Sequence, residues 1–189
     1  MTDVVLDRRQ QLLDLAAPLM ATRGFHGMSV GDLGAAAGIT APALYRHFPS
    51  KQALLGALLT DISERLLAGG ETCVAESSDP ADALERLVRR HVAFATSRPD
   101  LIRVQDRDFY SMSVDDQHAV RRLQRRYVEV WVRQVLAAHT AYDEDSVRAG
   151  IHAMFGLLNS TPYSADHLSQ ASAEQLLTRL ALQLLPSLG

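Results

Sequence analysis

Lysine and cysteine are nearly absent from this chain of 189 residues. Lys51 is the single lysine, and arginine supplies the other side chains that carry a positive charge at neutral pH. Cys73 is the single cysteine, so the chain forms neither an internal disulfide nor a multi-cysteine metal cluster. The net charge of −3 shows no overall basic excess, so composition alone does not indicate binding to a polyanion.

Long apolar runs and strand patterns are also missing. No stretch is apolar over the length needed to span a bilayer, and the first residues, MTDVVLDRRQQ, lack the apolar core of a signal peptide. We therefore expect a cytoplasmic protein. Alternating Val, Ile and Thr runs of strand length are absent, and hydrophobic residues make up 47% of the chain with aromatics at only 6%. These features favour an all-α fold.

Sequence motifs of catalytic sites are absent as well. The chain has no HExxH, GxSxG, GxGxxG or Walker motif, and no Glu-x-x-His pair of a helical di-iron site. Its seven histidines are scattered without metal-ligand spacing, and His91 falls on an apolar helix face, where we expect a core histidine. We therefore predict no enzyme activity, no cofactor and no metal site.

The stretch 29–55 carries the local signals of two short helices, a tight turn and the start of a longer helix. Ser29 and Asp32 form a pattern like a capping box at the first helix. Gly38 supplies the left-handed backbone that a sharp turn between helices tends to require, and Thr40 is placed to cap the second helix. This order of signals predicts a helix-turn-helix.

Four motifs in this region also occur in a known family. They are GFHGMSV before the first short helix, AAAGIT at the turn, LYRHF at the end of the second helix, and PSKQALL at the start of the long helix. Residues 25–55 thereby resemble the DNA-binding head of the TetR/AcrR transcriptional regulators. The resemblance implies a three-helix head at 1–52, joined by a long helix to a helical-bundle body for ligand binding and dimerisation at 53–189.

The second short helix, 41–48, is the predicted recognition helix in the major groove of double-stranded DNA. Small and basic side chains on it are candidates for base contacts, and hydroxyl groups near helix starts are candidates for phosphate contacts. The resemblance places further backbone contacts at Tyr45, His47 and Lys51. The full set of DNA-binding candidates is Ser29, Thr40, Ala41, Pro42, Ala43, Tyr45, Arg46, His47 and Lys51.

Alternatives remain open for parts of this helix. The segment APA at 41–43 brings no side-chain hydrogen bonds, so the shape of the DNA is a second source of specificity. His47 has an alternative role as a packing residue beside Phe48, and Tyr45 has an alternative place partly in the core.

Helical periodicity continues after the head. The pair Gly69-Gly70 is expected to end the long helix, and the polar residues 71–80 are expected to form a linker. The expected helices outside the helix-turn-helix cover 4–23, 51–68, 81–96, 115–139, 143–160 and 171–185, with a short ambiguous segment at 101–110 and a loop at 161–170.

Aromatic and arginine side chains in the body are candidates for an effector site. Apolar rings with a few polar groups are the usual lining of a small-molecule pocket, although an aromatic stripe at helical spacing also forms plain core. Six arginines between 103 and 126 can meet phosphates or a carboxylate, or form a solvated face paired with nearby aspartates. Asn159 is either a ligand contact or a helix cap. The ligand-binding candidates are Arg103, Arg107, Phe109, Tyr110, Tyr127, Trp131, Met154, Phe155 and Asn159.

The last two helices are the predicted dimer interface. Gly150 and Gly156 in one helix, with Ala173 and Ala181 in the other, allow close packing. The family resemblance implies a four-helix interface built from these helices of both subunits, and the alternative is that they only close the core of one subunit. An isolated head contacts few base pairs, so pairing of two heads is the usual solution.

These observations predict a bacterial one-component transcriptional regulator, most simply a repressor that binds a palindromic operator as a homodimer and is released by a small hydrophobic effector. The body faintly resembles family members whose ligands are acyl-coenzyme A thioesters, through DFYSMSVDDQHAVRRLQRRYVEVW and FGLLNSTPY. Three alternatives stay open: an activator, a regulator that responds to an unrelated apolar compound, and a helical ligand-binding or protein-interaction module that no longer binds DNA.

Overall fold

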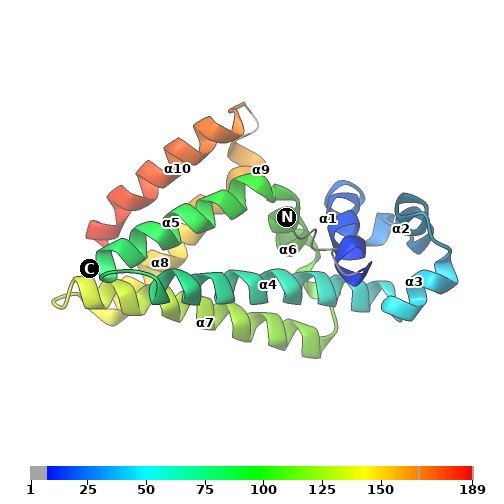
Figure 1. Ribbon diagram of the computed structural model, residues 1–189, viewed down its shortest axis with the longest axis horizontal. Helices are drawn as coiled ribbons and strands as arrows, with labels where there is room; N and C mark the ends of the chain where they lie inside the picture. The colour runs from blue at the N-terminus through cyan, green and yellow to red at the C-terminus, as the bar shows by residue number, and fades with distance from the viewer. Residues whose placement is uncertain (1–7, 166, 189) are drawn as a thin grey trace, which may run out of the picture. The chain divides into compact units, whose positions relative to one another are not determined.

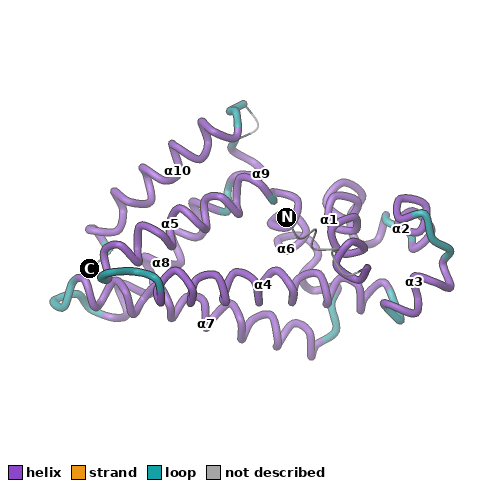
Figure 2. The backbone as a smooth tube through the Cα atoms, in the orientation of Figure 1, coloured by secondary structure: helices purple, strands orange, loops and turns teal. Residues whose placement is uncertain are grey.

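The computed structural model describes residues 8–165 and 167–188. Helices and short connections make up these residues, and none of them lies in a strand (Figure 2), which confirms the all-α prediction. The helices, labelled in Figure 1, are α1 Arg8–Gly27, α2 Val30–Ala37, α3 Ala41–His47, α4 Lys51–Ala75, α5 Pro80–Ser97, α6 Pro99–Asp108, α7 Val114–Ala138, α8 Glu144–Leu158, α9 Thr161–Ser164 and α10 Gln170–Leu184, with 3-10 turns at Phe109–Ser111 and Leu185–Ser187.

The described residues form two compact units. The first contains residues 8–62 and 100–120, and the second contains 63–99 and the described residues from 121 onward. Helices α4 and α7 each begin in the first unit and end in the second. These units do not divide the chain at the predicted boundary of 52 and 53, and the assignment of DNA binding to 1–52 and ligand binding to 53–189 stays a prediction.

The capping box at the start of α2 is confirmed. The Ser29 hydroxyl accepts from the Asp32 backbone N–H at 3.1 Å, and the Asp32 carboxylate accepts from the Ser29 backbone N–H at 2.8 Å. Arg23 adds an ion pair to Asp32 at 2.6 Å. Hydrogen bonds from Ser29, followed by the one from Arg23, lower the pKa of Asp32 to about 2, so its carboxylate stays charged at neutral pH.

The turn between α2 and α3 depends on two glycines. Gly38 has φ 64° and ψ 33°, the left-handed conformation expected from the sequence. The chain then folds back so that the Ile39 backbone N–H donates to the Gly34 carbonyl at 2.9 Å. A Cβ atom on Gly34 would lie 2.8 Å from the Ile39 carbonyl oxygen, which is closer than real Cβ contacts allow. The close approach therefore requires glycine at Gly34 as well.

Helix α1 breaks where the sequence predicts. Gly24 has φ 77° and ψ 161°, and one further helical turn follows to Gly27. Within the regular part, Leu12, Ala16 and Met20 are fully buried, as the apolar stripe predicts. The predicted first residues, 4–7, lie outside the described residues.

The predicted end of α4 at residue 68 and the predicted linker at 71–80 are both wrong, because the helix continues to Ala75 and α5 begins at Pro80. Gly69 and Gly70 are both buried within it. A Cβ atom on Gly70 would lie 2.7 Å from the Tyr127 ring, and one on Gly69 would clash with the Arg90 guanidinium. These glycines therefore let neighbouring side chains approach α4 closely, and their helix cost of about 1 kcal/mol each is offset by packing.

The other predicted helices match the structure to within one or two residues, apart from two segments. The ambiguous stretch at 101–110 is helix α6 followed by a 3-10 turn. The predicted loop at 161–170 contains the short helix α9. Thr161 explains this difference, because its buried hydroxyl donates to the Ala95 carbonyl at 2.9 Å and ties the segment to α5.

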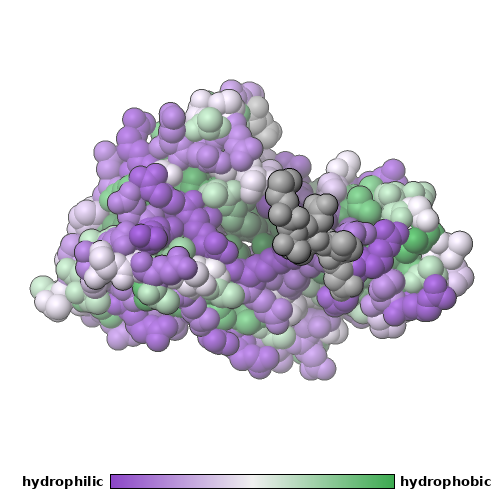
Figure 3. Space-filling model, in the orientation of Figure 1, coloured by the Kyte–Doolittle hydropathy of each residue, from purple (hydrophilic) through white to green (hydrophobic). Residues whose placement is uncertain are grey.

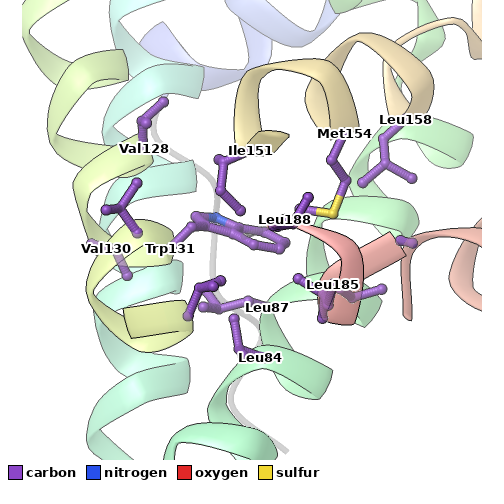
Figure 4. Packing of buried hydrophobic residues seen from close by; sticks show 14 of the residues in the cluster. Leu84, Leu87, Val128, Val130, Trp131, Ile151, Met154, Leu158, Leu185 and Leu188 are labelled. Atoms are coloured by element: carbon purple, nitrogen blue, oxygen red, sulfur yellow. The ribbon is translucent and has the colours of Figure 1, made fainter. Parts of the chain in front are cut away.

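The core of the second unit surrounds Trp131, which is fully buried. Figure 4 shows its indole between Ile151 of α8 and Leu87 of α5, with Met154 and Leu185 nearby. Helices α4, α5, α7, α8 and α10 and the 3-10 turn after α10 thus contribute to one apolar cluster, whose burial stabilises this unit.

His91 is the buried polar residue of this core, with 3% of its surface exposed. Its Nε2 lies 3.1 Å from the Asn159 Oδ1, and its Nδ1 lies 3.4 Å from the Tyr127 hydroxyl. A neutral ring fits both partners, because Nε2–H donates to the amide oxygen and Nδ1 accepts from the phenol. Burial lowers the pKa of His91 from 6.5 to about 4, with the Asn159 hydrogen bond acting weakly in the other direction.

Replacing Gly34 with alanine is expected to destabilise the helix-turn-helix by about 1–3 kcal/mol, because the new methyl group meets the Ile39 carbonyl. Gly31 in the same helix is the matched control. A Cβ atom there meets only the Ser29 hydroxyl at 3.5 Å, so Gly31→Ala should be neutral or stabilise by up to about 1 kcal/mol. Urea unfolding of both variants measures the difference, and equal free energies of unfolding would contradict the steric argument.

Protonation of His91 is expected to destabilise the second unit in mild acid. The unfolded ring titrates near 6.5 and the folded ring near 4, so this stability is complete above pH 6.5 and is lost as the pH falls towards 4. This pKa shift corresponds to about 3 kcal/mol in the free energy of unfolding. Urea unfolding between pH 7 and pH 5, above the range in which the aspartates titrate, should show the slope in the wild type and in His152→Gln, an exposed histidine, but not in His91→Gln. A slope that survives in His91→Gln would refute the assignment.

Candidate nucleic-acid interface and effector site

The nine DNA-binding candidates all reach the surface. Helix α3 turns Leu44 inward, with 2% of its surface exposed, and Phe48 follows it into the core. The residues between and before them point outward. Ser29, Thr40, Pro42, Tyr45, Arg46 and His47 are exposed, and Ala41, Ala43 and Lys51 are partly exposed.

Tyr45 and His47 lie outside the core. Tyr45 has 47% of its surface exposed, which is unusual for an aromatic side chain without a partner to cover it. The His47 ring lies 6.5 Å from the Phe48 ring at a tilt, and the Arg9 guanidinium lies 5.1 Å from the Phe48 ring centroid. Phe48 is therefore the packing residue of this pair, whereas His47 faces solvent.

Thr40 occupies the N-cap position of α3, but its side chain makes no capping hydrogen bond, contrary to the prediction. A capping hydroxyl accepts from the N–H groups of the second or third helical residue. Pro42 is the second helical residue and has no N–H group, which removes one of the two donors. The Thr40 hydroxyl is therefore exposed at the start of α3 and not tied to the helix.

Ser29 and Lys51 already have partners within the first unit. The Ser29 hydroxyl donates to the Asp32 carboxylate at 2.7 Å. The Lys51 ammonium donates to the Met28 carbonyl at 2.9 Å and lies 4.7 Å from the centroid of the Phe25 ring. Lys51 thus ties the start of α4 to the turn after α1, and any DNA contact from it would be added to this structural role.

Five of the nine ligand-binding candidates belong to the core of the second unit. They are Tyr127, Trp131, Met154, Phe155 and Asn159. His91 contacts four of them, Asn159 and the three aromatic side chains, and the sequence alone did not select it as a ligand residue. The ring of Phe155 lies 4.8 Å from the His91 ring and stacks on Tyr127 at 5.6 Å. Burial raises the pKa of Tyr127, so its hydroxyl stays protonated.

Two polar groups in this cluster are relevant to recognition. The Trp131 Nε1–H is buried and forms no well-aligned hydrogen bond within the described residues, although it lies close enough to the Tyr127 hydroxyl to oppose the rise in that group's pKa. Asn159 is the C-cap residue of α8, one of the two roles predicted for it, and its side chain accepts from His91, while its contact with a ligand stays a prediction. The cluster therefore offers an unpaired donor inside an aromatic environment, a costly arrangement in the absence of an acceptor.

The other four candidates, Arg103, Arg107, Phe109 and Tyr110, belong to the first unit, so neither unit contains all nine. Arg107 donates to the carbonyls of Met20 and Ala21 and pairs with Asp108 at 2.9 Å. The Tyr110 side chain has 77% of its surface exposed. Further along, Arg126 pairs with Glu71 at 3.2 Å, whereas Arg122 and Arg125 are exposed on α7.

A groove of about 680 Å³ lies between α5 and α10. Val92 and Leu182 give it an apolar wall, and Arg89 and Arg179 bring positive charge. On the face shown in Figure 3, hydrophilic side chains cover most of the surface and apolar ones form small separate patches. Sequence reasoning missed this groove, because its wall comes from two helices about 80 residues apart. The lining residues are Arg89, Val92, Ala93, Ala171, Glu174, Gln175, Thr178, Arg179, Leu182 and Gln183.

Three of the four small residues proposed for the dimer interface pack within the chain. Ala173 and Ala181 are buried, and a Cβ atom on Gly150 would lie 2.6 Å from Leu188. Gly156 differs, because it is exposed and has no neighbour within 4 Å of its Cβ position. Exposed small residues continue along this face of α8 at Ala149 and Ala153.

Across residues 8–165 and 167–188, no helix combines the length and the apolar character needed to cross a membrane. The comparison with family models gives two matches. Residues 12–58 match the bacterial regulatory proteins of the tetR family, and residues 77–178 match the tetracyclin repressor-like C-terminal domain.

Among curated proteins, the chain is similar to the HTH-type transcriptional repressor KstR2 of Rhodococcus jostii. The two are 40% identical over 81 residues, which cover 43% of this chain and 40% of the repressor. The aligned stretch thus spans less than half of that relative.

Solved structures show the same fold. The ketosteroid transcriptional regulator KstR2 of Mycobacterium tuberculosis superposes with a TM-score of 0.79 at 22% identity, covering 97% of this chain and 95% of that one. AibR, solved with isovaleryl coenzyme A and operator DNA, gives a TM-score of 0.76 at 17% identity, covering 92% of this chain and 97% of that one.

The matched families and relatives are transcriptional regulators and not enzymes. The C-terminal match alone covers more than half of the chain, and the N-terminal match contains the whole helix-turn-helix. The protein is a member of the TetR family of bacterial transcriptional regulators.

Proposed function

We propose that this protein is a repressor that binds a palindromic operator as a homodimer and leaves it when a small hydrophobic effector binds the body. The observation that carries the proposal is the outward face of α3. Tyr45, Arg46 and His47 are exposed there in a row, on a helix-turn-helix held by a capping box and two required glycines. A relative that is 40% identical over 81 residues is named a repressor. Because operator DNA lies in the cytoplasm of a bacterium, the protein would act there.

The dimensions and chemistry of α3 suit the major groove. An α-helix with its side chains is about 10–12 Å in diameter, and the major groove is about 12 Å wide, so α3 can enter it. Arg46 would bind guanine through its guanidinium, and the methyl groups of Ala41 and Ala43 would contact thymine methyls. The free Thr40 hydroxyl and the Tyr45 and His47 side chains would fix the register on the phosphates. Pro42 gives the helix start a rigid backbone.

Dimerisation would supply a second DNA-binding head for the second half-site of the operator. The heads of two subunits would meet operator half-sites about one DNA turn apart. The exposed face of α8 with Ala149, Ala153 and Gly156 is small enough for a partner helix to approach, and α10 adds the exposed Leu180. Helices α8 and α10 of both subunits would then form the four-helix interface that the family resemblance implies.

The effector would enter the second unit near the His91 cluster. An apolar acyl chain suits the rings of Tyr127, Trp131 and Phe155, and a thioester carbonyl would accept from the unpaired Trp131 Nε1–H. The arginines of the groove, Arg89 and Arg179, would attract the phosphates of a coenzyme A moiety. The complex of AibR with isovaleryl coenzyme A supports this class of effector. An unrelated apolar compound, or an activating role, remains the alternative.

Loss of the Tyr45 side chain is expected to weaken DNA binding by about tenfold or more for every operator variant, because a phosphate contact has no sequence preference. Tyr163, with 61% of its surface exposed in the second unit, provides the control Tyr163→Ala, which should bind as the wild type does. Fluorescence anisotropy with a duplex selected from a random library measures both affinities. Affinity of the wild type should also fall steeply with salt. Unchanged binding by a folded Tyr45→Ala would remove Tyr45 from the interface.

Acyl-coenzyme A thioesters are expected to stabilise the folded protein. A ligand that binds only the folded state adds about 2.7 kcal/mol at a hundred times its dissociation constant. Thermal unfolding with isovaleryl- and longer-chain thioesters, free fatty acids and coenzyme A measures this shift, with the free acids and coenzyme A as controls. Stabilisation by an unrelated drug-like compound and by no thioester would replace the thioester proposal with the alternative.

A further inference from the structure

The end of α6 is hydrogen-bonded to the end of α1. Arg107 donates from Nη1 to the Ala21 carbonyl at 3.1 Å and from Nη2 to the Met20 carbonyl. Its Nε and Nη2 also donate to the Asp108 carboxylate, at 3.1 and 2.9 Å. Asp108 in turn accepts from the Phe25 backbone N–H at 3.2 Å. We call these two residues the Arg107–Asp108 clamp.

The clamp supplies hydrogen-bond donors to carbonyl groups at the break in α1. The helix breaks at Gly24, where φ is 77°, and the last carbonyls before a helix end lack donors from within the helix. Arg107 supplies donors to two of these carbonyls, and its guanidinium carbon would lie 3.6 Å from a Cβ atom on Gly24. The Asp108 side chain is almost entirely buried, so its charge depends on the Arg107 pair and the Phe25 N–H.

The clamp joins two segments of the chain with different proposed tasks. Residues 100–120 belong to the same compact unit as the helix-turn-helix, although more than 40 residues separate them in sequence. Helix α6 follows directly on α5, with Arg98 between them, and α5 carries His91 of the proposed effector site. The clamp therefore binds α1 to the segment that directly follows α5 in the chain.

We propose that Arg107 and Asp108 are positioning residues, which hold the DNA-binding head in one orientation and thereby set the half-site spacing that the dimer accepts. The inference rests on the proposed function as an operator-binding dimer. Arg107 thus acts on the head and not on the effector, which differs from the role that the sequence predicts for it. Without the clamp the head samples more orientations. Affinity for DNA with the best half-site spacing then falls, and the loss of affinity at other spacings becomes smaller.

A duplex library with two half-sites at varied spacing tests the inference, with the half-site taken from selection on random DNA. The wild type is expected to prefer its best spacing over one changed by two base pairs by at least about tenfold, the effect of misplacing one set of base contacts. Arg107→Ala should reduce this preference to about threefold or less. Arg122→Ala, which removes an exposed arginine from α7, is the matched control and should keep the wild-type profile.

The shape of the spacing profile separates positioning from loss of fold, because an unfolded fraction lowers the affinity for all spacings equally. If Arg107→Ala loses its helical circular dichroism, the spacing profile of Arg107→Lys is measured in its place. Lysine keeps the charge but lacks the planar guanidinium that binds the two carbonyls and the carboxylate at once. A flattened profile in the folded variant supports the clamp. A wild-type profile in it overturns the inference and leaves the repressor proposal intact. A wild type that selects no duplex overturns both.

Discussion

Close contact at glycine positions is the constraint on which this structure depends. At Gly34 the chain turns back so tightly that a methyl group would collide with the Ile39 carbonyl, and this turn sets the angle between α2 and α3. At Gly70 the ring of Tyr127 lies against the backbone of α4. At Gly56 the Asp116 carboxylate occupies the space of a side chain. Both compact units are therefore assembled around contacts that only glycine permits.

Polar groups inside the two units are paired in different ways. In the first unit a charged pair, Arg107 and Asp108, binds backbone groups at the break in α1. In the second unit the histidine His91 stays neutral between Asn159 and Tyr127. The Arg107 side chain is 41% exposed and only Asp108 is buried, so this pair contributes orientation more than stability. The His91 ring is buried, and breaking one of its hydrogen bonds without a replacement would leave a buried polar group unpaired, which is costly.

Membership in the TetR family accounts for the helix-turn-helix and the helical body, but the effector depends on side chains that vary on the same fold. In this chain the groups on which the proposed effector site depends are the unpaired Trp131 Nε1–H, the His91 network and the arginines beside the α5–α10 groove. The proposed acyl-coenzyme A thioester would bring an apolar chain, one acceptor and anionic phosphates to them. The proposed effector class therefore depends on these side chains and not on the fold.

The amino-acid sequence by itself determined the elements governed by near neighbours: the Ser29 capping box, the left-handed Gly38, the break at Gly24 and the helices with a clear apolar stripe. Each depends on residues within about one helical turn. Only the tertiary structure decided that Gly69 and Gly70 continue α4 and that Arg107 binds α1. The deciding partners, Arg90 and Tyr127 for the glycines and Met20 for Arg107, lie more than 20 residues away, and no local pattern encodes such a contact.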